Sequence, residues 1–491
     1  MSVQSTVATS ERRIPEVLFN HAPAAVSYTF DEPNLVSAAG LVPVMRLAQS
    51  AGLAQLAQKH ITVANTGADK GANPGAKISS LVAGMAAGAD SIDDIDLLRH
   101  GGMKSLFDAV YAPSTLGSFL RVFTHGHVRQ LDAVSARLLK SFGTRAPLLP
   151  AGQSSGAGSM VFVDVDDTMV EVHSAKKQGA GIGYTGQRGL NALLATATTE
   201  ASAPIIVGQR LRKGNTYSAK GADKLISDAL AAVNRVPGQQ APVVVRADSA
   251  YYNSKVAKAA LNNGAQLSVT VKMLSTVKEK IREIPEGAWT GIEYPQAIFD
   301  ESSHTWISKA EVAEIPFTAF SSKKETEQVT GRLIVRRVPE LNETKRARGQ
   351  DPLFDTYRHH GFFTTIAPGV LGTVAADKTH RGHAVIEQIN AELKAGPLAH
   401  MPSGNFHANA AWLTIAAMAH NLLRTAAALI GGAFGRARAQ SLRQKLITIP
   451  ARIAHRSRQI IMHLPTEWKW RKEFTKLYDS LTAPPPVVPG T

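Results

Sequence analysis

The chain of 491 residues contains no cysteine. Disulfide bonds, thiolate zinc sites and cysteine nucleophiles are therefore excluded, and any metal ion must be held by oxygen or imidazole ligands. Oxygen ligands favour hard divalent cations such as Mg²⁺ and Mn²⁺. A metal-dependent site in this chain would thus depend on aspartate, glutamate or histidine.

The sequence also lacks segments typical of membrane or secreted proteins. No apolar run approaches the roughly 20 residues that a membrane-spanning helix requires. The first residues, MSVQSTVATSERR, have no apolar core of the kind found in a secretory signal. We therefore expect a cytoplasmic protein without a membrane partner.

Acidic residues are scarce relative to basic ones, since 39 Asp and Glu stand against 54 Lys and Arg and give a formal net charge of +15. A positive field over the whole protein favours polyanionic partners, and nucleic acid is the first expectation. With 44% hydrophobic residues the chain can form cores, and its length suits roughly two to four domains. These totals predict a globular protein that binds nucleic acid.

Changes in apolar periodicity divide the chain into five predicted segments. An all-α region comes first, and a stretch rich in Gly, Pro and Ser follows it as a linker. Strands alternating with helices then predict an α/β fold, a mixed sheet flanked by helices, with a β-rich insertion and a basic helical tail. The predicted boundaries are 1–145 for the helical DNA-binding region, 160–275 for the first part of the core, 276–359 for the insertion, 360–432 for the second part of the core and 433–491 for the DNA-binding or dimerisation tail.

The stretch FVDVDDTMVEVHS places three aspartates inside a run that otherwise predicts a buried strand. Because side chains alternate between the faces of a strand, Asp164 and Asp166 should share one face, with Asp167 on the other. Ionised carboxylates are unfavourable in such a place without a partner, so a metal ion or strong donors are expected beside them. A charged strand end is the alternative.

Two further segments carry candidate acidic residues. Asp248 follows the apolar run VVVRA, where a central strand would end and where ligands bind in α/β sheets, although a cap of the next helix is the alternative. Asp377 is expected to cap a helix through DKTHRGHAVIEQINAELKAGP. One polar stripe of that helix, for which a solvated face is the alternative, consists of His380, His383, Glu387 and Lys394.

Two aspartates and a glutamate can hold two hard cations about 3.5 to 4 Å apart, an arrangement that recurs in phosphodiester chemistry. In a basic chain the expected substrate is DNA or RNA. A zinc site built on His380 and His383 is a poor alternative, because their spacing lacks a matching third ligand nearby.

Three groups of basic residues are predicted to contact DNA. Arg121 lies in a segment that fits a helix-turn-helix, with an ordinary bundle helix as the alternative. A loop after a predicted strand and the basic tail supply the others, with pairing to surface acids and a merely solubilising tail as the alternatives. These residues are Arg210, Arg212 and Lys213 in the loop, and Arg443, Arg452 and Arg456 in the tail.

These acidic residues occur together with four further stretches, FDEPNLVSAAGLVPVMRLA, LRKGNTYSAKGA, IEQINAELK and SLRQKLITIPARIAHRSRQIIMHLPTEWKW. In this combination the chain resembles the DDE transposases of bacterial insertion sequences, especially the family named after insertion sequence 1380. The resemblance implies a ribonuclease-H-like sheet with an acidic triad and a β-rich insertion before the glutamate. The intervals are 248 − 166 = 82 residues and 387 − 248 = 139 residues. The group's helix signature, Tyr, Arg, Glu and Lys, keeps its spacing here, but histidines occupy the first two places.

The resemblance implies catalytic and metal-binding roles for Asp166, Asp248 and Glu387, with two Mg²⁺ or Mn²⁺ ions. It selects Asp166 because the group's first carboxylate stands two residues before Thr or Ser, and Asp164 is the second candidate. By the same resemblance His380, His383 and Lys394 are DNA-contacting positions. A Trp of the insertion, Trp289 or Trp306, would stabilise a flipped base, with a buried core Trp as the alternative.

The activity implied is cut-and-paste transposition through a hairpin intermediate, by a homodimer acting on double-stranded DNA. Its DNA partners would be transposon terminal inverted repeats and target DNA, in the bacterial cytoplasm in association with the nucleoid. A nuclease or resolvase of similar fold is one alternative. A catalytically inactive DNA-binding protein is another, which the presence of all three carboxylates disfavours.

Overall fold

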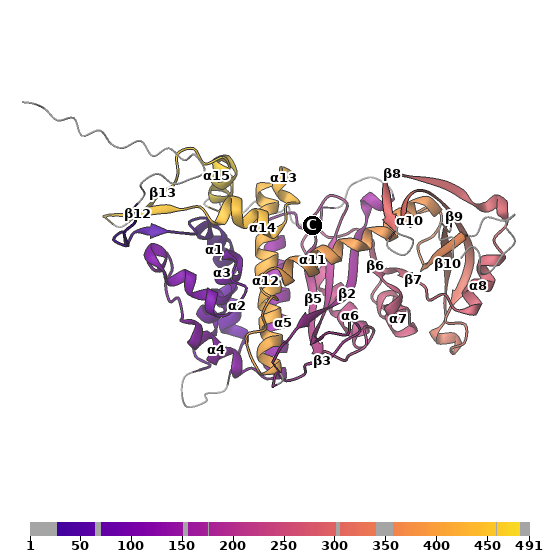
Figure 1. Ribbon diagram of the computed structural model, residues 1–491, viewed down its shortest axis with the longest axis horizontal. Coiled ribbons are helices and arrows are strands. Elements are labelled where there is room, and N and C mark those ends of the chain that lie inside the picture. The colour runs from indigo at the N-terminus through magenta and orange to yellow at the C-terminus, as the bar shows by residue number, and fades with distance from the viewer. Residues whose placement is uncertain are drawn as a thin grey trace, which may run out of the picture.

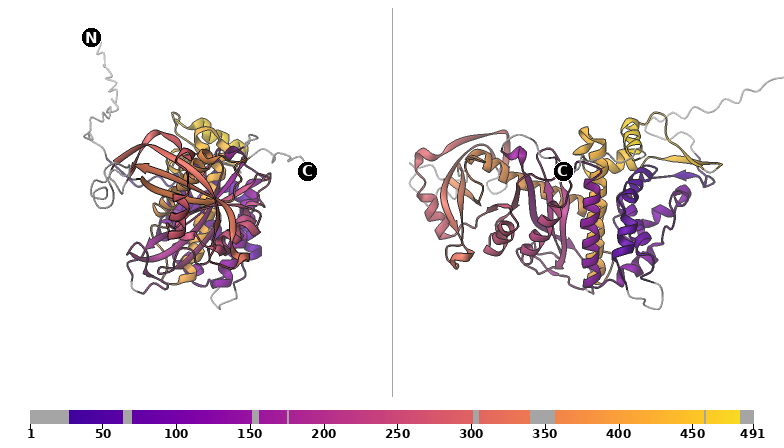
Figure 2. Two further views of the ribbon diagram at one scale, coloured as in Figure 1. Left: turned by 90° about the vertical axis from the view of Figure 1, so that its right-hand side faces the viewer. Right: turned by 180° about the vertical axis from the view of Figure 1, so that it is seen from behind.

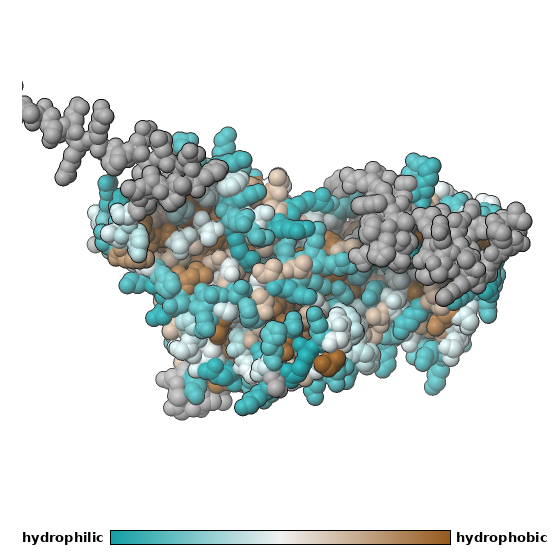
Figure 3. All heavy atoms as spheres, viewed as in Figure 1, coloured by the Kyte–Doolittle hydropathy of each residue, from teal (hydrophilic) through white to brown (hydrophobic). Residues whose placement is uncertain are grey.

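The computed structural model describes residues 27–63, 70–150, 156–174, 176–300, 305–339, 357–457 and 459–481. The molecule is elongated, with the N-terminal helices at one end and the strands of the β-rich segment at the other (Figure 1). Hydrophilic residues cover most of the face seen in Figure 3, as is usual for a protein surface in water.

The N-terminal region is mainly helical, as predicted, and its helices begin at recognisable signals. Pro113 opens one helix at its first turn, where a missing N–H does no harm. Thr124 and His127 form a capping box that opens the next. Gly88, at φ +118°, ends another in the left-handed region that glycine tolerates. The helices are α1 (Leu41–Ser50), α2 (Leu53–His60), α3 (Pro74–Ala87), α4 (Pro113–Arg121) and α5 (His125–Gly143), with 3₁₀ turns at Asp93–Arg99 and Gly101–Ser105.

A ten-stranded mixed sheet forms the centre, which confirms the predicted α/β class. Its order is β3-β4-β2-β6-β7-β11-β10-β9-β8, and β5 also pairs with β4. Strands β2, β6 and β7 run parallel, whereas β4 is antiparallel to both β2 and β5. The strands are β2 (Val161–Glu171), β3 (Gly181–Ile182), β4 (Arg188–Thr198), β5 (Ile205–Lys213), β6 (Val243–Ala247), β7 (Gln266–Thr270), β8 (Thr290–Asp300), β9 (Thr305–Ala319), β10 (Val329–Pro339) and β11 (Tyr357–Thr364).

The β-rich segment continues the central sheet. Strand β11 pairs antiparallel with β7 on one side and with β10 on the other, so the core strands and those of the segment share one hydrogen-bonded sheet. The charged loop ELNETKRARGQD lies outside the described residues.

Helices cover both faces of the sheet. On one face α6 packs against β5 and α7. On the other, Phe162 of β2 packs in a cluster with Ala376 of α10. The predicted helix that Asp377 caps starts earlier than expected, because α10 begins at Thr373 and Asp377 lies inside it, ion-paired with Arg381. The helices here are α6 (Ala222–Val233), α7 (Ser254–Asn262), α8 (Ser275–Arg282), α10 (Thr373–Arg381) and, after a 3₁₀ turn at Gly382–Ala384, α11 (Val385–Lys394).

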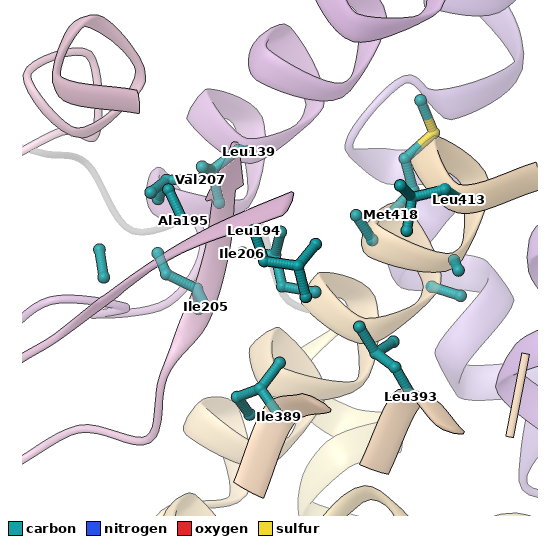
Figure 4. Packing of buried hydrophobic residues seen from close by; sticks show 14 of the residues in the cluster. Leu139, Leu194, Ala195, Ile205, Ile206, Val207, Ile389, Leu393, Leu413 and Met418 are labelled. Carbon is teal, nitrogen blue, oxygen red and sulfur yellow. The ribbon is translucent and has the colours of Figure 1, made fainter. Parts of the chain in front are cut away.

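Helix α12 (Phe406–Ile430) joins the sheet to the N-terminal helices, packing against α5, β5 and α3. Figure 4 shows Leu413 of α12 in one cluster with Leu194 and Ile206 of the sheet and Leu393 of α11. By length and composition α12 could cross a membrane, which corrects the expectation that no run is long enough. However, 89% of its most apolar window is buried in the protein, so its apolar surface is explained by the core.

The C-terminal region corrects the expectation of a purely helical tail. Ala451 and Ile453 are buried and Arg452 between them is exposed, a period-two pattern that suits a strand. Strands β12 (Ala451–Arg456) and β13 (Gln459–His463) form a hairpin, and β1 (Leu35–Val36) adds to it, so the N-terminal region is not all-α either. Figure 2 shows this hairpin beside the N-terminal helices. The remaining elements are α13 (Gly432–Gly435), α14 (Ala439–Leu442), a π turn at Arg443–Ile447 and α15 (Arg471–Ser480).

Candidate active site

Two of the predicted acidic residues lie side by side at the end of β6. Strands β2 and β6 are parallel neighbours, and their last paired residues are Val165 and Ala247. Asp166 and Asp248 follow directly, so they lie at the same level on adjacent strands. Asp166 is partly buried and Asp248 is more exposed. The structure therefore brings together carboxylates that are 82 residues apart in sequence.

Burial, and to a smaller extent the nearby negative charges, raises the pKa of both acids. Burial raises the pKa of Asp166 to about 6, and the negative charges of Asp167 and Asp248 add to this effect. Burial, together with the charge of Asp167, also raises the pKa of Asp248. Asp248 also caps the turn that follows it, because its Oδ1 accepts a 2.9 Å hydrogen bond from the Ala250 amide. Carboxylates crowded in this way bind protons or cations more readily than isolated ones.

Asp164 is completely buried and fully engaged with cationic partners. Arg246 donates to both of its oxygens, at 2.7 and 2.8 Å, and His383 Nδ1 lies 2.9 Å from Oδ1. Burial alone would raise the pKa of Asp164, but the charge of Arg246 and the hydrogen bond of His383 hold that pKa below its usual value. Asp164 thus has protein partners for both oxygens, which disfavours it as the second candidate for the first catalytic, metal-binding carboxylate.

Asp167 faces the opposite side of β2 and is engaged as well. Tyr251 donates a 2.7 Å hydrogen bond to Oδ1, and Arg212 lies 3.0 Å from Oδ2. Asn191 donates to the same Oδ2. Because Tyr251 belongs to the turn directly after Asp248, this network ties that turn to β2.

Glu387 is exposed on α11, a helix that packs against β2. Four residues before it, His383 contacts Asp164, and three residues after it, Asn390 donates a 2.8 Å hydrogen bond to Asp166 Oδ2. Residues at these spacings share one helical face, so Glu387 lies between two contacts to β2. Across the described ranges, no three His, Asp or Glu side chains are grouped as a ready-made metal cluster.

The junction between α10 and α11 is held close to the sheet. Arg246, besides binding Asp164, donates to the Thr379 carbonyl near the end of α10. A Cβ at Gly382 would lie 2.6 Å from Arg246 Nη1, so glycine permits this approach. The junction thereby fixes where the helix carrying Glu387 begins.

Several predicted DNA-contacting residues are buried, and their positions correct that expectation. His380 packs on Phe362 with ring centroids 4.1 Å apart and bonds to the hydroxyls of Ser268 and Thr270. Burial lowers the pKa of His380 to about 3, so the ring is neutral. His383 is engaged with Asp164 as described. Both histidines hold the helix on the sheet through contacts within the protein.

Arginines that were predicted to grip DNA have structural partners too. Arg212 is buried and donates to Asn191 and to the carbonyls of Ser218 and Lys220, besides pairing with Asp167. Arg210 pairs with Asp228 at 3.1 Å, which is the alternative given for it above.

Arg443 also has a structural role, since it donates to the Met85 and Ala86 carbonyls at the C-terminal end of α3. Trp289 packs against the edge of the core with the guanidinium of Arg337 over its ring at 4.3 Å. The side chain of Trp306 lies outside the described residues.

The predicted basic residues that remain exposed are spread over the molecule. They are Arg121 at the end of α4, Lys213 at the end of β5, Lys394 at the end of α11, and Arg452 and Arg456 on β12. Their exposed side chains leave them available to phosphates.

The sequence reasoning missed residues that organise the site. They are Arg246, Tyr251 and Asn390, and two of them have a signal in the sequence. Arg246 is a charge inside the apolar strand VVVRA, and Asn390 is a polar residue three positions after Glu387, on the same helical face. Asp167 was placed on the opposite face of the strand but was given no role.

The sequence profile of the family described as "Transposase DDE domain group 1" matches residues 21–485. No curated protein matches the chain. Among solved structures, the cryo-EM structure of a piggyBac transposase synaptic complex with hairpin DNA is similar at 11% sequence identity, covering 91% of this chain and 86% of that chain, with a TM-score of 0.39.

Proposed function

This chain belongs to the family of transposase DDE domains, group 1, and from that premise we propose that it is a DNA transposase that cleaves transposon ends and joins them to target DNA. The observation that carries the proposal is the neighbouring position of Asp166 and Asp248 at the end of β6, with a helix that binds Asp166 and presents Glu387. These two carboxylates lie at the edge of the sheet where α/β folds place their active sites, and Glu387 would join them as the third ligand.

The contacts of the three aspartates on β2 support Asp166 as the first catalytic carboxylate. Asp164 is occupied by Arg246 and His383, and Asp167 by Arg212 and Tyr251. Asp166 accepts a hydrogen bond from Asn390 to its Oδ2 and another from the Asp167 amide, and among the described residues it forms no ion pair. Its flanking aspartates therefore act as positioning residues, while Asp166 is left to bind a cation.

The strand order supports the finer proposal of a ribonuclease-H-like core. Strands β5, β4, β2, β6 and β7 lie in that spatial order, with β4 antiparallel and with α6 and α7 as the helical connections. The β8–β11 segment lies between Asp248 and Glu387 in sequence, where the resemblance places an insertion.

The residues present fit a pair of Mg²⁺ or Mn²⁺ ions. Asp166, Asp248 and Glu387 supply the hard oxygen ligands that these ions prefer. The amide oxygen Oδ1 of Asn390 is buried beside Asp166 and has no hydrogen-bond partner within the described ranges. When bound, such ions activate the attacking oxygen and stabilise the leaving one.

The chain's own residues position these ligands. Arg246 and His383, through Asp164, hold the helix that carries Glu387 against β2. Tyr251, through Asp167, holds the turn after Asp248. These networks fix the carboxylates before DNA binds, which is the preorganisation that catalysis requires.

We extend the proposal to cut-and-paste transposition through a hairpin by a homodimer bound to paired terminal inverted repeats, in a bacterial host and of the family named after insertion sequence 1380. The exposed Arg121, Lys213, Lys394, Arg452 and Arg456 would contact the DNA backbone. The second candidate function is a nuclease or resolvase that cuts without joining.

The decisive experiment incubates the purified full-length protein with the DNA that flanks its own gene and Mg²⁺, and resolves nicks, hairpins and joined strands. Glu387→Gln should abolish every product and leave DNA binding intact. Glu279→Gln, the same change at an exposed position of α8, is the matched control and should act as wild type.

Cleavage by Glu387→Gln would overturn the assigned triad. A pre-cleaved end that is never joined to target DNA would favour the nuclease or resolvase. An unaltered protein that binds DNA and forms no product in Mg²⁺ or Mn²⁺ would favour the inactive DNA-binding protein.

A further inference from the structure

A cleft of about 800 Å³ opens beside the turn that follows Asp248. Its walls are the starts of α6, α7 and α8 and the turn between β9 and β10. These helices follow β5, β6 and β7, whose carboxyl ends lie at the same edge of the sheet as Asp166. The cleft therefore adjoins the candidate active site on the α6 and α7 side, opposite the side covered by α11.

The rim of the cleft carries unpaired positive charge. Its carboxylates are Asp223 and Glu327, and Glu327 accepts a 3.1 Å hydrogen bond from Ser254. In the part of the chain that the structure describes, the lysines of the cleft make no ion pair, and all of them are exposed. They are Lys220, Lys255, Lys272 and Lys323. A concave surface with free ammonium groups attracts a polyanion.

The wall of the cleft carries aromatic rings. Tyr252 and Phe320 lie with ring centroids 4.8 Å apart, tilted by 36°. Phe320 has φ +62°, a strained conformation for a bulky side chain of the kind that recurs at ligand sites. Tyr217 also lines the cleft and is 69% exposed. Aromatic faces of this kind are platforms on which unpaired bases stack.

We propose that this cleft binds single-stranded DNA, with phosphates on the lysines and unpaired bases on Tyr252, Phe320 and Tyr217. A duplex keeps its bases stacked on one another, so it cannot use these rings, whereas a separated strand can. The inference rests on the proposed function, because the turn that links Tyr252 to Asp248 makes a strand freed at the cleavage site the natural occupant.

The test measures binding of a fluorescent oligo(dT) of about 12 nucleotides to the full-length protein by anisotropy, in EDTA so that no cleavage occurs. Tyr252→Leu, which keeps apolar bulk and removes the stacking face, should weaken binding by about tenfold. The double variant Lys255→Glu with Lys323→Glu should weaken binding by about tenfold or more and flatten its salt dependence.

The matched control reverses the charge of two exposed lysines that do not line the cleft. Lys278→Glu with Lys324→Glu makes the same change in net charge nearby and should leave oligo(dT) binding within about twofold. Photo-crosslinking of a 5-iodouracil oligonucleotide to the unaltered protein should label Tyr252, Tyr217 or Phe320, independently of any variant.

The outcomes separate this inference from the proposed function. Loss of oligo(dT) binding in the cleft variants supports the cleft even where no cleavage is seen in Mg²⁺. Equal binding by the cleft and control variants overturns it even where cleavage is seen. Equal weakening for a duplex of the same length, or crosslinks confined to other regions, also overturns it.

Discussion

Arg246 donates to both carboxylate oxygens of Asp164, at 2.7 and 2.8 Å, inside the protein core. The pair joins β2 to β6, and Arg246 also reaches the Thr379 carbonyl near the end of α10. A buried ion pair of this kind specifies an arrangement more than it adds stability, because desolvation offsets much of the attraction. Here the arrangement specified is the position of the helix that carries Glu387.

Removing one partner of this pair should be strongly destabilising. Asp164→Asn leaves the guanidinium of Arg246 buried without a countercharge, so we expect a loss of about 3 to 5 kcal/mol in the free energy of unfolding. Urea unfolding followed by circular dichroism measures it. Asp164→Leu with Arg246→Met should recover most of that loss. A stable Asp164→Asn protein that has lost cleavage would instead return Asp164 to the metal ligands.

The burial of Asp166, together with the nearby acids, should appear as a pH-dependent effect on stability. Its pKa is raised to about 6 from an ordinary value of 3.8, so its contribution to stability is present below about pH 3.8 and lost as pH rises through 6. At pH 7.5 without metal, Asp166→Asn should therefore stabilise the protein, by about 1 to 2 kcal/mol after solvent screening. Thermal unfolding in EDTA tests this, and destabilisation at pH 7.5 would contradict it.

The contribution of His383 to stability should depend on pH in the same direction as that of Asp166. Burial alone would lower its pKa, but the hydrogen bond and charge of Asp164 raise the pKa above the ordinary 6.5. Its stabilising contribution is thus complete below pH 6.5 and lost as pH rises through the folded-state pKa. We expect the stability difference between the unaltered protein and His383→Gln to shrink from pH 6 towards alkaline pH. A difference that grows over this range would show that His383 is held neutral.

Asn390 should increase the affinity of the site for Mg²⁺. Its Nδ2 donates to Asp166 and its Oδ1 is buried without a partner, so Asn390→Ala removes both a ligand support and a candidate oxygen. We expect about 10- to 100-fold weaker apparent Mg²⁺ affinity in the cleavage assay. Gln388→Ala, an exposed change on the same helix, is the control. An unchanged Mg²⁺ titration would exclude Asn390 from the site.

The exposed arginines of the C-terminal tail should contribute to DNA binding, whereas the partly buried one should contribute to stability. Arg452→Ala and Arg456→Ala on β12 should each weaken DNA binding and lower the salt slope by about one, as expected for a lost phosphate contact. Arg443→Ala should instead lower stability and leave the salt slope unchanged, because its donors cap α3. Anisotropy at several salt concentrations and thermal unfolding distinguish these results. A lowered slope for Arg443→Ala would place it on the DNA surface.

Local patterns in the sequence predicted which strands and helix faces form the site, but they did not predict the side-chain contacts within it. Alternation along β2 placed Asp164 and Asp166 on one face and Asp167 on the other, in agreement with their contacts to His383, Asn390 and Tyr251. The β12–β13 hairpin was missed because the many basic residues of the tail masked its short period-two pattern. The start of α10 was misplaced by taking Asp377 as a cap.

The sequence alone determined the class of fold, the acidic residues available and the exclusion of thiol chemistry, because periodicity and residue type are local properties. Only the tertiary structure decided that Asp164 binds Arg246 and that His380 and Arg212 are buried, leaving Asp166 beside Asp248. The physical reason is that the energy of a charge depends on its partners and its solvent. Those partners come from segments 45 to 219 residues away, which no local pattern specifies.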